Sequence, residues 1–176
     1  MPSPATRKLP TSMPPGEAVA QRYAVVFSFS GFKIVPKEDP MNVTPYLFFP
    51  GNCEAAFKFY EKALGAKIDV IMPHAGSPAE SHVPPEWANK VMHARLKLGD
   101  RYLMASDAPP GHHRQMQGFS VTLDVDTPAE AERVFKALSE NGTVTMPIEK
   151  TFWAERFGMV TDQFGTPWMI NCEKPA

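Results

Sequence analysis

From Val43 onward, apolar and polar positions follow a pattern that predicts a defined order of strands and helices. Residues 43–49 are apolar and rich in β-forming types, and a Pro-Gly pair follows them, which predicts a strand. Apolar residues then recur at helical spacing up to Leu64, and Gly65 supplies a stop signal, which predicts a helix. Three more strands are expected at residues 67–72, 91–97 and 102–106, with a loop rich in Pro, Ser and Gly over residues 74–90.

The two expected helices carry different start signals. Asn52 stands at the N-cap place of the first helix, and Glu54 lies in its first turn, where a negative charge favours the helix dipole. The second helix begins with the run TPAE at residues 127–130, which combines a capping box with Pro at the first helical position. We expect this helix to end at the Asn-Gly pair of residues 141–142.

The second half of the chain repeats the order of the first. A strand is predicted over residues 119–125, and after the second helix come strands at residues 143–146, 157–161 and 168–172. A shift of 74 residues places Asn52 on Asp126, and a shift of 66 aligns the closing strands. Because cap, helix, stop and strand recur in one order, the sequence predicts a duplication with modules at 43–108 and 118–173.

Composition excludes several classes of function. The chain has 176 residues with a formal net charge of −1, and its Lys and Arg residues do not gather on one segment, so a nucleic-acid partner is not expected. No apolar run reaches the roughly 18 residues of a membrane-spanning helix, so no membrane partner is expected either. The two cysteines, Cys53 and Cys172, favour a reducing compartment over a disulfide framework, which predicts a cytoplasmic protein.

Residues 1–42 form a Pro-rich N-terminal extension. Seven of the 19 prolines lie in the first forty residues, which favours a poorly ordered segment, apart from an apolar run at 23–29 that is typical of a short strand. We interpret this extension as poorly ordered or as an over-called start, with Met41 as the natural first residue.

Several short motifs between residues 43 and 173 resemble one known family when taken together. The matching segments are TPYLFF at 44–49, GNCEAA at 51–56, VMHA at 91–94, LMASD at 103–107, TFW at 151–153, FGMVTD at 157–162 and WMIN at 168–171. They resemble the PhnB-like family of the vicinal oxygen chelate (glyoxalase/bleomycin-resistance/dioxygenase) superfamily. The resemblance implies an α+β fold, in which two βαβββ modules form a cupped mixed sheet with helices outside and a cavity inside. It also implies a homodimer and a small-molecule ligand.

Many members of that superfamily hold a divalent metal at four places in the cavity, which the resemblance puts at Pro45, about Leu103, Phe119 and Met169. None of these side chains can bind such an ion, which needs imidazole, carboxylate or thiolate donors. A slip of one residue would offer Tyr46, Met104, Ser106, Ser120 and Asn171 or Trp168 instead, which is not a metal set either. We therefore predict no metal site and no cofactor, with a divalent metal kept as an alternative.

Three polar residues are candidates for catalysis: His93, Asp107 and Glu155. His93 stands on an apolar strand and is expected to point into the cup, although a core histidine with one hydrogen bond has the same pattern. Asp107 ends the next strand, where its carboxylate either lies within reach of His93 or caps the loop that follows. Glu155 is expected on the same strand face as Trp153, where it either adds a charged group to an aromatic wall or pairs with a surface cation. The expected ligand-binding residues are Tyr46, Phe49, His93, Met104, Phe119, Trp153, Glu155, Met169 and Asn171.

The leading functional prediction is a protein that binds a small, partly apolar molecule in the cavity between the paired modules. One alternative is a metal-dependent lyase, isomerase or dioxygenase that uses a shifted ligand set such as His93, Asp107 and Glu155. The other is a non-enzymatic sequestering or accessory protein.

The thiol of Cys53 lies at the N-terminus of the first helix, which could lower its pKa and make it somewhat acidic. Packing explains the presence of this cysteine equally well.

Overall fold

A computed structural model describes residues 42–175 of the chain. The expectations about the Pro-rich extension, its short strand at 23–29 and the start at Met41 fall in residues 1–41 and lie outside the described residues.

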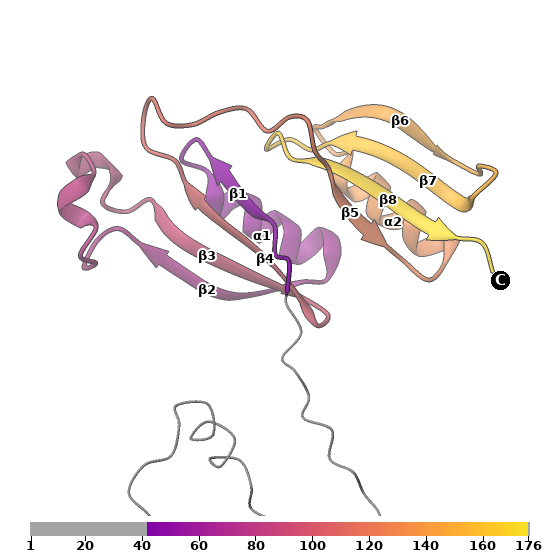
Figure 1. Ribbon diagram of the computed structural model, residues 1–176, viewed down its shortest axis with the longest axis horizontal. Coiled ribbons are helices and arrows are strands. Elements are labelled where there is room, and N and C mark those ends of the chain that lie inside the picture. The colour runs from indigo at the N-terminus through magenta and orange to yellow at the C-terminus, as the bar shows by residue number, and fades with distance from the viewer. Residues whose placement is uncertain (1–41, 176) are drawn as a thin grey trace, which may run out of the picture. The chain divides into compact units, whose positions relative to one another are not determined.

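The first module has one helix and four strands in the predicted order (Figure 1). They are β1 (Tyr46–Phe49), α1 (Cys53–Leu64), β2 (Lys67–Pro73), β3 (Val91–Leu98) and β4 (Arg101–Asp107). Two short 3₁₀ turns, η2 (Glu80–His82) and η3 (Pro85–Trp87), interrupt the long loop before β3.

The second module repeats this order. Its elements are β5 (Val121–Asp124), α2 (Pro128–Leu138), β6 (Thr143–Glu149), β7 (Ala154–Thr161) and β8 (Pro167–Glu173). β6 and β7 extend beyond their predicted bounds, whereas β5 is shorter, so Phe119 precedes the strand rather than beginning it.

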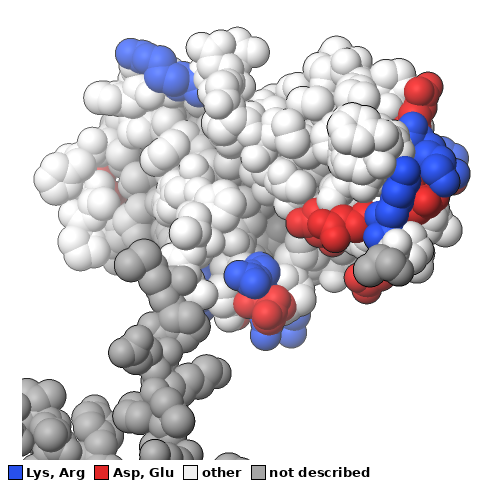
Figure 2. Space-filling model, turned by 45° about the vertical axis from the view of Figure 1, so that its right-hand side comes forward, with Lys and Arg blue, Asp and Glu red and all other residues white. Residues whose placement is uncertain are grey.

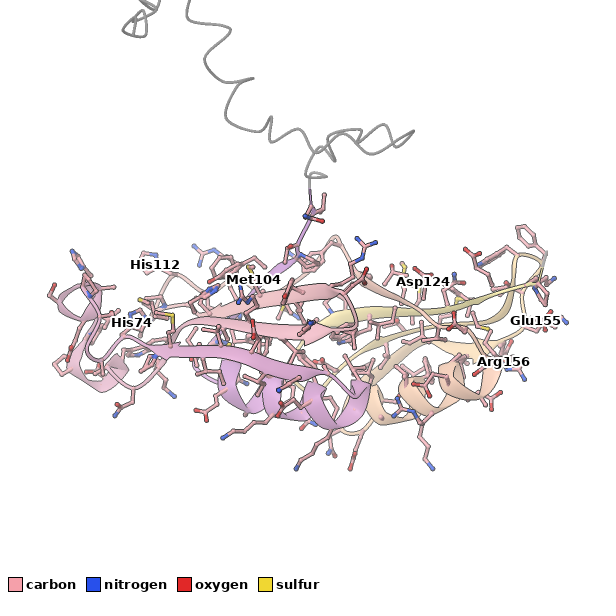
Figure 3. All side chains as sticks on the ribbon, turned by 90° about the horizontal axis from the view of Figure 1, so that it is seen from below. His74, Met104, His112, Asp124, Glu155 and Arg156 are labelled. Carbon is pink, nitrogen blue, oxygen red and sulfur yellow. The ribbon has the colours of Figure 1, made fainter. Side chains whose placement is uncertain are left out.

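Each module forms its own four-stranded mixed sheet. The strand orders are β1-β4-β3-β2 and β5-β8-β7-β6, so the two sheets share one topology. In each sheet the first strand pairs in parallel with the fourth, and the remaining pairs are antiparallel. Both helices lie on the same side of the sheets (Figures 1 and 3). The predicted α+β fold of two βαβββ modules is confirmed.

The core lies between the sheets and the helices. Alternate residues of each strand are buried against the helix of their module, as expected for sheets with one covered face. Leu47 and Phe49 of β1 and Trp168 and Ile170 of β8 are almost fully buried in this way. Within residues 42–175, no helix covers the opposite face of each sheet (Figure 3).

A buried carboxylate joins the two modules. Oδ2 of Asp162 accepts hydrogen bonds from the Tyr60 hydroxyl of α1 at 2.7 Å and from Nε1 of Trp168 at 2.8 Å. Oδ1 accepts from the backbone N–H groups of Phe164 at 2.8 Å and Thr166 at 3.0 Å. Burial, followed by the nearby Asp162 carboxylate, raises the pKa of Tyr60 well above its ordinary value, so this hydroxyl stays a donor.

The two helices begin in different ways. Thr127 caps α2 as predicted, because its side chain accepts from the backbone N–H of Glu130 at 3.2 Å. Asn52 precedes α1 but makes no side-chain capping bond. Oδ1 of Asp107, at the end of β4, accepts from the backbone N–H of Cys53 at 2.9 Å instead. The first helix is therefore capped by a carboxylate from a distant strand.

Candidate functional site

The uncovered faces of the two sheets, opposite the helices, are called the open face here. Strand alternation and register assign its members, and Met104 and Asp124 can be seen on that side in Figure 3. The main residues are Tyr46, Phe48, His93, Arg95, Tyr102 and Met104 in the first sheet, and Thr122, Asp124, Phe157, Met159, Met169 and Asn171 in the second.

Aromatic and sulfur-containing side chains dominate the open face of the first module. The side chains of Tyr46 and Phe48 are 40% and 51% exposed, which is unusual for large apolar groups. The Tyr46 hydroxyl and Nδ1 of His93 lie 3.2 Å apart in a hydrogen bond, and the two rings stack at 5.8 Å. Met104 lies directly beside Tyr46 on the neighbouring strand. This arrangement forms an apolar wall with one imidazole and one phenol as polar groups.

A positive group borders that wall. Nε of Arg95 donates to Asp69 at 2.7 Å, and the guanidinium lies over the ring of Tyr102 at 5.0 Å. These contacts hold the guanidinium in place, and the pair with Asp69 neutralises its charge.

Strand register arranges the open face of the second module in two rows. One row carries Thr122, Met169, Met159 and Met146 across β5, β8, β7 and β6. The neighbouring row carries Asp124, Asn171, Phe157 and Glu149 across the same strands. The two rows place apolar sulfur next to polar groups.

Asp124 and Asn171 form the polar pair of the second row. Nδ2 of Asn171 donates to Asp124 at 2.9 Å, and Oδ1 of Asn171 is buried without a hydrogen-bond partner in the described residues. The sequence prediction included Asn171 but missed Asp124. The parallel pairing of β5 with β8, which the βαβββ plan implies, is the signal that identifies Asp124.

An aromatic run extends the open face beyond the sheet. Trp153 is 47% exposed and packs edge-on against Phe157 at 5.6 Å. Phe152, at the tip of the β6–β7 turn, is 87% exposed and contacts Trp153 at 4.5 Å. Trp153 therefore lies at the surface beside Phe157 and not in the core.

The Glu155 carboxylate forms an ion pair with a neighbouring lysine. Both of its carboxylate oxygens accept from Nζ of Lys150 at 3.0 Å, and this bond is the main reason that its pKa lies below the ordinary value. Arg156 pairs with Glu132 of α2, on the helix side.

In Figure 2 most of the visible described surface is uncharged, and many of the charged side chains gather toward one end.

Asp107 does not meet His93. Its side chain is buried and accepts from the backbone N–H groups of Cys53 and Val91, both at 2.9 Å. It points to the helix side of β4, whereas His93 pairs with Tyr46 on the open face. The predicted contact between carboxylate and imidazole is therefore wrong, and Asp107 acts as a cap.

Three other predicted positions lie away from the open face. Phe49 is fully buried in the core beside α1, and Leu103 is 7% exposed in the same core, so Met104 is the residue of β4 that faces outward. Phe119 is exposed on the loop before β5.

The residues present do not fit the divalent metal of the superfamily. Alternation places two carboxylates on the open face of β1, β4, β5 and β8: Asp124, which is engaged by Asn171, and Glu173, which is exposed at the end of β8. No group of three His, Cys, Asp or Glu residues within 42–175 is arranged to hold a metal ion. The shifted set of His93, Asp107 and Glu155 is likewise not brought together.

Both thiols are free and buried. Burial, followed by the neighbouring charge of Asp107, raises the pKa of the Cys53 thiol far above its ordinary value. Of the two readings of Cys53, packing is the one that this environment supports, because burial disfavours the thiolate.

A hollow of about 550 Å³ lies where the modules meet, and it shares Tyr102, Thr122 and Asp124 with the open face. Its lining is mostly apolar and includes Pro45, Leu64, Leu103, Leu123 and Trp168. It lies at the edges of the two sheets and does not include the Tyr46–His93 pair.

The fold and the open face define a duplicated α+β protein that presents two apolar sheet faces bearing a few fixed polar groups. In the described part of the chain, no helix combines the length and the apolar character needed to cross a lipid bilayer.

Comparison with known proteins identifies the family. Residues 43–170 match the Glyoxalase/Bleomycin resistance protein/Dioxygenase superfamily. The chain is 37% identical over 144 residues to Protein YjdN of Escherichia coli K12, an alignment that covers 76% of this chain and 97% of that protein. The chain belongs to this superfamily, which confirms the resemblance.

Solved structures share the fold. The crystal structure of protein PA1353 from Pseudomonas aeruginosa is 47% identical, with a TM-score of 0.71, and the match covers 77% of this chain and all of that one. The PhnB protein from Bacillus cereus, at 23% identity and a TM-score of 0.64, covers 75% of this chain and 99% of its own.

Proposed function

We propose that this protein binds a small, partly apolar molecule on its open face in the cytoplasm, without a metal ion. The observation that carries the proposal is the exposure of Tyr46 and Phe48 on the open face and of Trp153 beside it, next to the Tyr46–His93 and Asp124–Asn171 pairs. Apolar surface of this kind is costly to leave in water, at about 25 cal/mol per Å². The two buried thiols are compatible with a reducing compartment.

We further propose that a second copy of the chain provides the opposite wall of the cavity. Each sheet ends in a strand, β1 or β5, with no further strand beside it in residues 42–175, and unpaired strand edges favour association. A homodimer would place the Tyr46–His93 wall of one subunit against the Asp124–Asn171 wall of the other. The bound molecule would then contact apolar rings on both sides and hydrogen-bond to His93 or Asn171.

Equilibrium binding of the fluorescent dye 8-anilinonaphthalene-1-sulfonate, with EDTA present throughout, tests the binding proposal. We expect saturable binding that is weakened about ten-fold in Phe48→Ser, because losing one aromatic contact costs roughly 1.4 kcal/mol or more. Val144→Ser is the matched control, because Val144 is 45% exposed beside α2 and not on the open face. Binding that EDTA abolishes, or equal loss in both variants, would contradict the proposal.

Sedimentation equilibrium tests the dimer separately. The expected mass is twice the chain mass of 19.5 kDa at micromolar concentration. A mass of one chain over the whole concentration range would refute the composite cavity while leaving dye binding to be judged by its own experiment.

A further inference from the structure

We propose that Met146, Met159 and Met169 form a thioether site on the open face that binds one soft monovalent metal ion, Cu(I) or Ag(I). The proposal requires neither the dimer nor the small-molecule ligand, and it concerns a different class of metal from the divalent ions of the superfamily.

Strand register brings the three methionines together. Met146 of β6 is the direct partner of Met159 of β7, and Met159 is the direct partner of Met169 of β8. Directly paired residues of antiparallel strands point to the same face, with their Cβ atoms about 4.5–5.5 Å apart. The three side chains therefore occupy one continuous row with Met159 at its centre.

The row faces away from the core. Gly158 and Val160, which flank Met159, are buried on the side of α2, and Trp168 and Ile170 flank Met169 in the same way. A register irregularity on each side of Met146 turns that residue to the face of its partner Met159. All three methionines are partly exposed, so an ion can reach their sulfur atoms.

The chemistry of the row selects the ion. Thioether sulfur is a soft donor that binds Cu(I) and does not compete for Zn²⁺ or Mg²⁺, which take harder ligands. Each sulfur lies two bonds beyond Cβ on an unbranched side chain with three rotatable bonds, so the outer two can turn toward Met159. The Met169 sulfur now accepts a weak contact from the Thr122 hydroxyl at 3.9 Å, which rotation toward Met159 would break at little cost.

Methyl NMR of protein labelled with ¹³C at the methionine methyl groups tests the site. Silver nitrate is titrated into the full chain without chloride or thiol reductant, and zinc sulfate is titrated in parallel. We expect the signals of Met146, Met159 and Met169 to move together and to saturate at one Ag(I) per chain, with no response to Zn²⁺. Met159→Leu, which nearly conserves volume, should weaken Ag(I) binding at least ten-fold.

Met104→Leu is the matched control, because Met104 is partly exposed on the open face of the other sheet with Tyr46 and Arg95 as its register partners. It should bind Ag(I) like the unmodified chain. If Met159→Leu does not fold, Met169→Leu serves for the same comparison. Static signals from the three methyl groups, uptake of Ag(I) by the buried thiols alone, or an equal response of Met104 would each overturn the proposal.

Discussion

Replacing Asp162 with Asn should cost the protein a large part of its stability, because the side chain accepts four hydrogen bonds, one of which, from Tyr60, joins the two modules. Both carboxylate oxygens of Asp162 accept two donors each. An amide has one oxygen and one NH₂ group, so in either orientation its NH₂ group meets two donors. The substitution keeps the shape and removes half of the acceptors.

The expected loss follows from the count of bonds. Hydrogen bonds to a charged group contribute roughly 1.5–3 kcal/mol each, and two are lost. The Tyr60 hydroxyl can still donate to Oγ1 of Thr166, 2.9 Å away, which offsets part of the loss. We therefore expect Asp162→Asn to lower the free energy of unfolding by about 3 kcal/mol. Tyr60→Phe, which removes one donor and leaves three, should lower it by about 1–2 kcal/mol.

Urea unfolding followed by tryptophan fluorescence and far-UV circular dichroism measures both effects. Asp100→Asn is the control, because this surface carboxylate is 91% exposed and lies 3.5 Å from Arg101, so its replacement should leave the unfolding midpoint unchanged. A loss below about 1 kcal/mol for Asp162→Asn, or one no larger than that of Tyr60→Phe, would refute the proposed role of the carboxylate.

Three further outcomes are expected. Cys53 should resist alkylation by iodoacetamide at pH 8 in the native protein and react after unfolding, because burial raises its pKa; fast native labelling would contradict this. The hydrogen bond from Arg133 lowers the pKa of the Glu130 carboxyl. The stability that this carboxylate contributes is therefore present above the ordinary pKa of 4.5 and is lost as pH falls through the lowered value. Carboxyl NMR titration should show a higher pKa for Glu130 in Arg133→Gln. Gly158→Ala should destabilise by about 1–3 kcal/mol in thermal unfolding, because the added Cβ would lie 2.7 Å from the Phe135 ring; an unchanged melting temperature would contradict this.

The order of elements could be predicted from the sequence because its signals are local. Thr127 lies three residues from the N–H group that it caps, and a short window of sequence contains both. The cap of α1 could not be predicted in this way, because Asp107 lies 54 residues from Cys53. A long-range hydrogen bond leaves no mark in the local pattern, and Asn52 satisfied the same pattern without making the bond.

The candidate site was predicted only in part, for reasons of strand geometry. A shift of 66 residues placed Tyr102 on Trp168, yet Tyr102 lies on the open face and Trp168 lies in the core. Side chains alternate with a period of two, so an error of one residue reverses the face of a whole strand. The place that the resemblance put at about Leu103 for the metal lies in the core, whereas the predicted ligand-binding residues Met104, Met169 and Asn171 lie on the open face.

The capping of α1 by Asp107 makes the two duplicated halves unequal in the way they acquire structure. The start of α2 is stabilised by residues already adjacent in the chain, so that helix can gain its first turn while the rest is still unfolded. The start of α1 is capped only when β4, which follows it by about four dozen residues, has folded beside it. Closing so long a loop has an entropic cost before any contact is gained. One half of the molecule is therefore able to nucleate locally, while the other depends on its last strand.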